Sequence, residues 1–166
     1  MDRLIQGERT VPTVYIESTV ISYRTARPSR DLVVATHQQL TLEWWDNVLP
    51  ALTPFVSQFV WEEITRGDPE AAARRIKAIE GIPSLEMSPP IADLAREYFD
   101  AIRLPETART DAFHVALAVH HGLDYLVTWN CTHIAGGRVR AIVQQINERR
   151  GIATPVICTP EELMEV

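Results

Sequence analysis

The chain has 166 residues, of which 46% are hydrophobic and 23% charged, values typical of a soluble globular domain. This composition excludes a disordered chain, and no apolar run approaches the roughly 18 residues that a membrane span requires. The net charge of −6 argues against broad, nonspecific attraction to nucleic acid.

We expect a single domain over residues 1–166, with residues 1–11 as a flexible N-terminal extension and no contact with a membrane. The first residues lack the basic start and apolar stretch of a secretory signal, which predicts a cytoplasmic protein. Cys131 and Cys158 are too few for a disulfide framework, so we expect both thiols to be reduced.

Short apolar runs alternate with helical patterns along the chain. In order, they predict a strand at 14–16, helices at 18–25 and 31–48, a strand at 55–57, helices ending at 67 and 81, a strand at 84–87, helices at 89–103 and 106–121, a strand at 125–128, a helix at 139–149, a strand at 156–158 and a helix from 161. The strand runs are continuously apolar, as in strands buried on both faces. We therefore predict an α/β fold with three layers (α/β/α) around a central, mostly parallel sheet of about four or five strands.

Polar residues at the carboxyl ends of the strands are the first candidates for a site, because ligands bind at that edge of open α/β sheets. Glu17 follows the first strand, and Asn130 follows the strand at 125–128. For Glu17, a solvated residue at a strand exit is the alternative interpretation.

Asp111 lies within the apolar stripe of the helix at 106–121. Ionised groups are almost never buried without a partner, so a metal ion, an arginine or a helix N-terminus should compensate this charge. The alternative to metal binding or catalysis is capping, since a carboxylate near the start of a helix is stabilised by the helix dipole.

Glu62 and Glu63 are adjacent, so only one of them can face inward from a helix. Glu63 shares a face with Phe59 and Val60, and we predict that Glu63 is the inward residue. An all-oxygen cluster suits Mg²⁺ or Mn²⁺, which are used in phosphodiester hydrolysis. The predicted members of this cluster are Glu17, Glu63, Asp111 and Asn130. We expect His114 to be a core histidine bonded to a partner.

Four stretches that cover nearly the whole chain carry a resemblance to a known family: VYIESTVISY at 14–23, VSQFVWEEI at 56–64, TDAFHVALA at 110–118 and YLVTWNCTHI at 125–134. Together, and in this order, they resemble the PIN-domain family, in particular the VapC-like toxin ribonucleases of toxin–antitoxin pairs. The resemblance implies a PIN-like fold and a metal-dependent endoribonuclease that uses Mg²⁺ or Mn²⁺. It also implies an RNA substrate, a small antitoxin partner and a homodimer, as for the toxin of a type II pair.

The family's acidic positions fall on Glu17, Glu63, Asp111 and Asn130. The chain departs from the family at two of them, since Glu17 and Asn130 stand where the family has Asp. A site with charge −3 instead of −4 should hold a divalent ion less tightly. The alternative function is therefore a catalytically weakened PIN-fold module that binds RNA or a partner protein.

Lys77 is the only lysine, and the other basic residues are arginines, whose guanidinium groups suit phosphate. A solvated arginine surface is the alternative to RNA contact for the five candidates, Arg24, Arg27, Arg30, Arg138 and Arg140. The helix that carries Trp44 and Trp45 is the predicted contact surface for an antitoxin or a second subunit.

Overall fold

The centre of the protein is a parallel sheet, seen in a computed structural model that describes residues 10–164. Within these residues, five strands pair in the order β3-β2-β1-β4-β5, and every neighbouring pair is parallel. The strands are β1 (Thr13–Ile16), β2 (Thr53–Ser57), β3 (Ser84–Leu85), β4 (Tyr125–Val127) and β5 (Val156–Cys158). The strand order reverses direction between β1 and β4, which is where open α/β sheets form a crevice.

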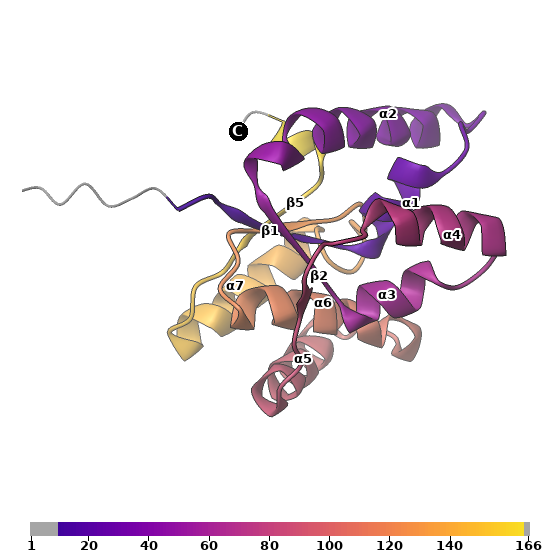
Figure 1. Cartoon of the computed structure of the whole chain (residues 1–166). Coiled ribbons are helices and arrows are strands. Elements are labelled where there is room, and N and C mark those ends of the chain that lie inside the picture. Colours follow the sequence, from indigo (N-terminus) through magenta and orange to yellow (C-terminus); the bar gives the residue numbers. More distant parts are fainter. Residues whose placement is uncertain (1–9, 165–166) are drawn as a thin grey trace, which may run out of the picture.

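Helices cover both faces of the sheet (Figure 1). Helices α1, α2 and α4 lie on one side, α5, α6 and α7 lie on the other, and α3 contacts members of both groups. Their bounds are α1 (Ser18–Thr25), α2 (Leu32–Asn47), α3 (Gln58–Ile64), α4 (Pro69–Ala78), α5 (Pro89–Ile102), α6 (Arg109–His120) and α7 (Gly137–Arg150). The predicted three-layer α/β/α fold is confirmed.

Strand β1 is the most enclosed element of the sheet. Val14, Tyr15 and Ile16 are fully buried, because β2 and β4 flank the strand and helices cover both of its faces. The register pairs Ile16 with Val127, so β1 and β4 end side by side. Residues that follow these two strands are thereby brought to the same edge.

Two predicted helices differ from the structure. The helix expected at 106–121 begins as a 3₁₀ turn over Glu106–Ala108, and the α-helix starts only at Arg109. The backbone of Ala108 has φ −109° and ψ 15°, which interrupts the α-helical geometry. The helix expected from 161 is a single 3₁₀ turn, Glu161–Leu163.

Of the two tryptophans on α2, the helix predicted as a contact surface, only Trp45 is accessible to a partner. Trp44 is 0% exposed and Trp45 is half-buried. The buried stripe of α2 consists of Gln38, Thr41 and Trp44. Because two of these residues are polar, the stripe cannot be recognised from the spacing of apolar residues.

The expected N-terminal extension falls almost wholly on residues 1–9, which lie outside the described residues. Over residues 10–164, no helix is both long and apolar enough to cross a membrane. Cys131 and Cys158, both within this range, are free thiols as expected.

Candidate metal centre

Three of the predicted site residues lie at the carboxyl edge of the sheet. Glu17 directly follows β1 and is the N-cap of α1, and Glu63 lies on α3, which follows β2 without a gap. Asn130 comes shortly after β4. Asp111 approaches the same region from the first turn of α6.

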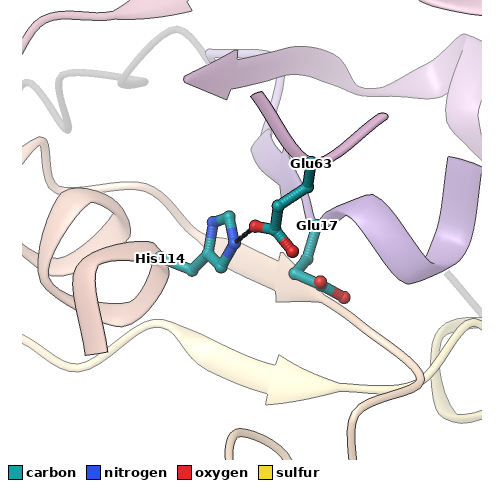
Figure 2. Close-up of side chains that lie close together, drawn as sticks. All are labelled: Glu17, Glu63 and His114. Atoms are coloured by element: carbon teal, nitrogen blue, oxygen red, sulfur yellow. Dashed lines mark hydrogen bonds and ion pairs between the residues drawn. The ribbon is translucent and has the colours of Figure 1, made fainter. Parts of the chain in front are cut away.

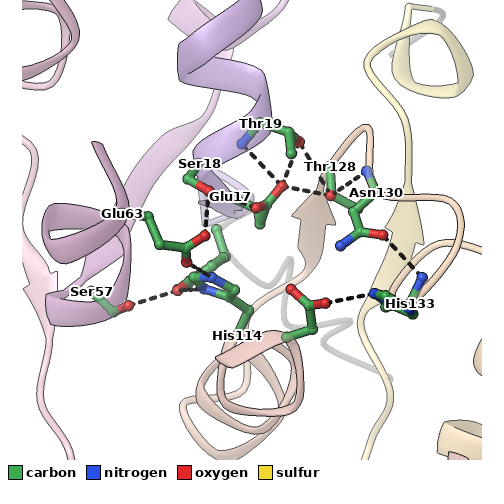
Figure 3. A network of polar contacts seen from close by, with 11 residues as sticks. Glu17, Ser18, Thr19, Ser57, Glu63, His114, Thr128, Asn130 and His133 are labelled. Carbon is green, nitrogen blue, oxygen red and sulfur yellow. Dashed lines mark hydrogen bonds and ion pairs between the residues drawn. The ribbon is translucent and has the colours of Figure 1, made fainter. Parts of the chain in front are cut away.

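The carboxylate of Glu17 is buried, with 1% of the residue exposed. It accepts hydrogen bonds from the Ser18 hydroxyl (2.8 Å), the Thr19 backbone N–H (3.1 Å), the Thr19 hydroxyl (2.5 Å) and the Thr128 hydroxyl (2.7 Å). Thr19 and Thr128 belong to the segments that follow β1 and β4 (Figure 3). The donors to Glu17 are therefore brought together where the strand order of the sheet reverses. Every donor is neutral.

Glu63 faces Glu17 from the neighbouring element, as predicted, whereas Glu62 is exposed. One Glu63 oxygen bonds to Nε2 of His114, and the other lies 3.0 Å from the Ser18 hydroxyl. Figure 2 shows Glu63 between His114 and Glu17.

The Ser18 hydroxyl lies within hydrogen-bonding distance of both Glu17 and Glu63. It has one hydrogen and can donate to only one of the two carboxylates. The carboxylate oxygen that receives no hydrogen then faces the lone pairs of the Ser18 hydroxyl, which is unfavourable away from water. The two carboxylates therefore compete for this one hydrogen, and among the described residues no Lys or Arg forms an ion pair with Glu17, Glu63 or Asp111.

His114 is fully buried, and both of its ring nitrogens have partners. Nε2 bonds to Glu63, and Nδ1 lies 2.6 Å from the Tyr15 hydroxyl, which lies 2.7 Å from the Ser57 hydroxyl. Burial alone would lower the pKa of His114, but the bond to Glu63 and the surrounding carboxylates outweigh it and raise that pKa. Burial raises the pKa of Tyr15, so the phenol stays protonated.

The contact with His114 has a matching effect on the pKa of Glu63. Burial acts to raise the pKa of Glu63, but the bond and the charge of His114 outweigh it and lower that pKa. His114 is bonded to Glu63 through Nε2 and to the Tyr15 hydroxyl through Nδ1, so the expectation of a core or partner-bonded histidine is confirmed.

Asp111 has a side chain that is 13% exposed and bonded to Nδ1 of His133 at 3.0 Å. Burial raises the pKa of Asp111, the charges of Glu17 and Glu63 add to this effect, and the positive charges of the two histidines only partly offset it. The Asp111 carboxylate thus contacts the loop that carries His133. Without a bound cation, the ionised form of Asp111 is unfavourable.

Asn130 organises the loop that carries His133. Its side-chain oxygen accepts the backbone N–H of His133 at 2.9 Å, and its backbone carbonyl accepts the N–H groups of Ile134 and Ala135 (Figure 3). The predicted ligand oxygen thus already holds a protein donor and has one lone pair left.

Ligand atoms of Glu17, Glu63 and His114 all lie within 4.8 Å of one another, which is the spacing of a metal-binding group. Because both His114 nitrogens are bonded, we assign this histidine to the orientation of Glu63 and not to direct coordination. The oxygen donors of the site are then Glu17 and Glu63, with Asp111 beside them.

The five candidate RNA-binding arginines do not gather around the carboxylates. Arg30 is exposed, and the other four contact groups elsewhere in the protein. These contacts are Arg24 with Asp46 (3.8 Å), Arg27 with Glu70 (3.5 Å), Arg138 with the Ile102 carbonyl (3.0 Å), and Arg140 with the Ile157 carbonyl (3.3 Å) and Glu162 (3.2 Å).

No protein-family model matches the chain, and the search of curated proteins gives no significant match. The function must therefore be inferred from the geometry of the site and from the motifs in the sequence.

Proposed function

We propose that the protein is a divalent-metal-dependent endoribonuclease. The observation that carries this proposal is the buried Glu17 beside the half-buried Glu63, which compete for the single hydrogen of Ser18 near a third, partly buried carboxylate, Asp111. Among the described residues, these three carboxylates have only the histidines His114 and His133 as ion-pair partners, and such a concentration of negative charge favours a cation.

The donor set fits Mg²⁺ or Mn²⁺, which prefer carboxylate oxygens. Glu17, Glu63 and Asp111 would hold the ion. When bound, it lowers the pKa of a coordinated water and offsets negative charge on a phosphodiester.

The surrounding residues hold these carboxylates in place before substrate arrives. Thr19 and Thr128 fix Glu17, His114 fixes Glu63 from the side opposite Ser18, and His133 fixes Asp111. Fixed ligands require little reorganisation during the reaction, which is the main way in which such outer contacts assist a metal site.

The resemblance to the PIN-domain family supports the RNA substrate and extends the proposal to a toxin of a type II pair. In that case a small antitoxin binds the protein, and the active species is a homodimer. A short reading frame next to this gene that encodes a DNA-binding protein would support the toxin assignment.

Cleavage of a labelled single-stranded RNA in Mn²⁺ tests the proposal. We expect cleavage by the wild type, loss of cleavage in EDTA, and a reduction of at least about 100-fold in Glu63→Gln. Glu62→Gln is the matched control, because Glu62 is the exposed neighbour on the same helix. Cleavage that persists in EDTA, or that is equal in both variants, would refute the proposal.

A catalytically weakened module that binds RNA or a partner is the second candidate, and Asn130 favours it. The family Asp at this position is replaced by an amide whose oxygen accepts a loop N–H. Asn130→Asp keeps this acceptor and adds a charge, so a large gain in a feeble cleavage rate would support the weakened module. An unchanged rate would count against it.

A further inference from the structure

A neutral cavity of about 340 Å³ lies between α1 and α2, beside the carboxylates. Its size falls in the range of about 300–1,000 Å³ that is usual for small-ligand sites. Its lining residues are Ser18, Thr19, Ser22, Tyr23, Ala26, Val34 and Gln38. Ser18 and Thr19 also bond to Glu17 (Figure 3). The cavity and the carboxylate site therefore share these two residues.

The cavity has an aromatic side with a fixed position. Tyr23 lines it and packs edge-on against His37 and Trp129, whose rings stack with a centroid distance of 4.1 Å and an interplanar angle of 15°. The indole N–H of Trp129 donates to the Thr41 hydroxyl at 2.7 Å, and its backbone N–H donates to the Thr19 hydroxyl at 2.9 Å. The aromatic group is therefore tied to the same threonine that holds Glu17.

The polar end of Gln38 is fully used within the protein. Its oxygen accepts the Ser29 N–H at 2.9 Å, and its nitrogen donates to the Arg27 carbonyl at 3.0 Å. These bonds hold the rim of the cavity in place. None of the lining side chains is charged, which favours a flat neutral ligand over an anion or a cation.

A charged cleft of about 460 Å³ adjoins the cavity and shares Ser22 and Ala26 with it. The cleft is lined by Arg27, Arg74 and Arg75, together with the acidic side chains of Asp68 and Glu70, and Arg27 pairs with Glu70 at 3.5 Å. Arginines contact phosphates without reading sequence. A neutral aromatic cavity between a carboxylate site and an arginine-lined cleft has the layout expected for a nucleotide chain, with the base in the cavity.

We propose that this cavity receives one unpaired base of the RNA, next to the phosphodiester that faces Glu17 and Glu63. Unpaired bases of RNA are bound by stacking on aromatic side chains and by hydrogen bonds to their edges. Tyr23 provides the ring, and Ser22 adds a polar side chain to the lining. The choice of RNA as the ligand rests on the proposed function. Because the cavity takes an unpaired base, it selects single-stranded over double-stranded RNA.

Val34→Trp tests the proposal, because a larger side chain at this position fills the cavity from its α2 wall. Val33→Trp is the matched control, since Val33 is the preceding residue, is 65% exposed and does not line the cavity. Binding of a labelled oligoribonucleotide is measured by fluorescence anisotropy in EDTA and again in Ca²⁺, and thermal unfolding checks that each variant folds. We expect the Kd to rise about tenfold or more in Val34→Trp and to stay unchanged in Val33→Trp.

A set of oligoribonucleotides with one abasic position each identifies the bound base. For the wild type, one abasic position should weaken binding about tenfold, and the same position should have no effect in Val34→Trp. Tyr23→Ala should reproduce the loss, and Tyr23→Phe should retain binding because it keeps the ring.

The proposal is overturned if the wild type binds no RNA in either buffer, if Val34→Trp binds as the wild type does, or if no single base matters. Failure of the nuclease assignment gives a different result. The RNA then binds with one sensitive base, but it is not cut in Mn²⁺.

Discussion

Asp111 is a partly buried carboxylate that has no Lys or Arg ion-pair partner within residues 10–164. Burial raises its pKa, so its ionised form destabilises the metal-free fold near neutral pH. A functional residue that is unfavourable for folding is typical of sites that trade stability for activity.

Asp111→Asn should therefore stabilise the metal-free protein at pH 7. The amide oxygen can still accept from His133, while the buried charge is removed. We expect the Tm to rise by about 2–4 °C, which corresponds to about 1 kcal/mol for a chain of this size. Calorimetry in EDTA measures it, with Glu62→Gln as the control, and a lower Tm in Asp111→Asn would show that Asp111 is a structural residue.

The pair of Glu63 and His114 predicts a pH dependence of stability. The pKa of folded His114 is raised above its ordinary value of 6.5, so its protonation contributes stability that is fully present below pH 6.5. That contribution is lost as the pH rises through the folded-state pKa. The slope is at most about 1.4 kcal/mol per pH unit for one proton.

Glu63→Gln removes the carboxylate that does most to raise the pKa of His114. The free energy of unfolding of this variant should therefore decline less between pH 6.5 and 9 than that of the wild type. Urea unfolding in EDTA at several pH values measures both curves. Parallel curves for the wild type and Glu63→Gln would mean that the histidine is not charged by its partner.

The helical phase was sufficient to select Glu63 over Glu62, because the apolar residues before it define the inward face of α3. The bonds of His114 could not be predicted in the same way. Tyr15 is 99 residues away from His114 along the chain, and only the packing of α6 against β1 brings the two together. The bond from the His133 N–H to the Asn130 side chain could not be predicted either, because it depends on the turn that follows Asn130.

At the scale of elements, the loop between β4 and α7 places Asn130 and His133. This loop folds back closely on Gly136, where an added Cβ would lie 2.4 Å from the Cys131 carbonyl oxygen. The φ of Gly136 is −63°, so the requirement for glycine is one of space and not of backbone conformation.

Gly136→Ala should displace this loop and lower stability by about 1–3 kcal/mol, as for other overpacked positions. It should also weaken Mn²⁺ binding, since His133 would no longer hold Asp111. Gly137→Ala is the control, because an added Cβ there meets nothing within 4 Å. Equal Tm values and equal Mn²⁺ affinities for the two variants would contradict this account of the loop.

Most elements could be predicted from local patterns, since the continuous apolar runs mark the strands and Pro or Gly marks many helix ends. The prediction for α1 matches the observed Ser18–Thr25. The exposed surface of α2 could not be predicted, because its buried stripe contains Gln38 and Thr41, whose polar groups are satisfied only in the folded protein.

For the whole molecule, a net charge of −6 opposes nonspecific binding of RNA. Three of these charges lie together at Glu17, Glu63 and Asp111, at the reversal point of the sheet. A divalent ion would offset much of this local charge. RNA binding should therefore depend on the metal and on a local site.

Calorimetric titration of the metal-free protein with Mn²⁺ tests the carboxylate centre most directly. We predict saturable binding to the wild type, binding at least about tenfold weaker in Asp111→Ala, and unchanged binding in Glu62→Ala. Absence of binding to the wild type, or equal affinity in the wild type and Asp111→Ala, would contradict the assignment of these residues as a metal site.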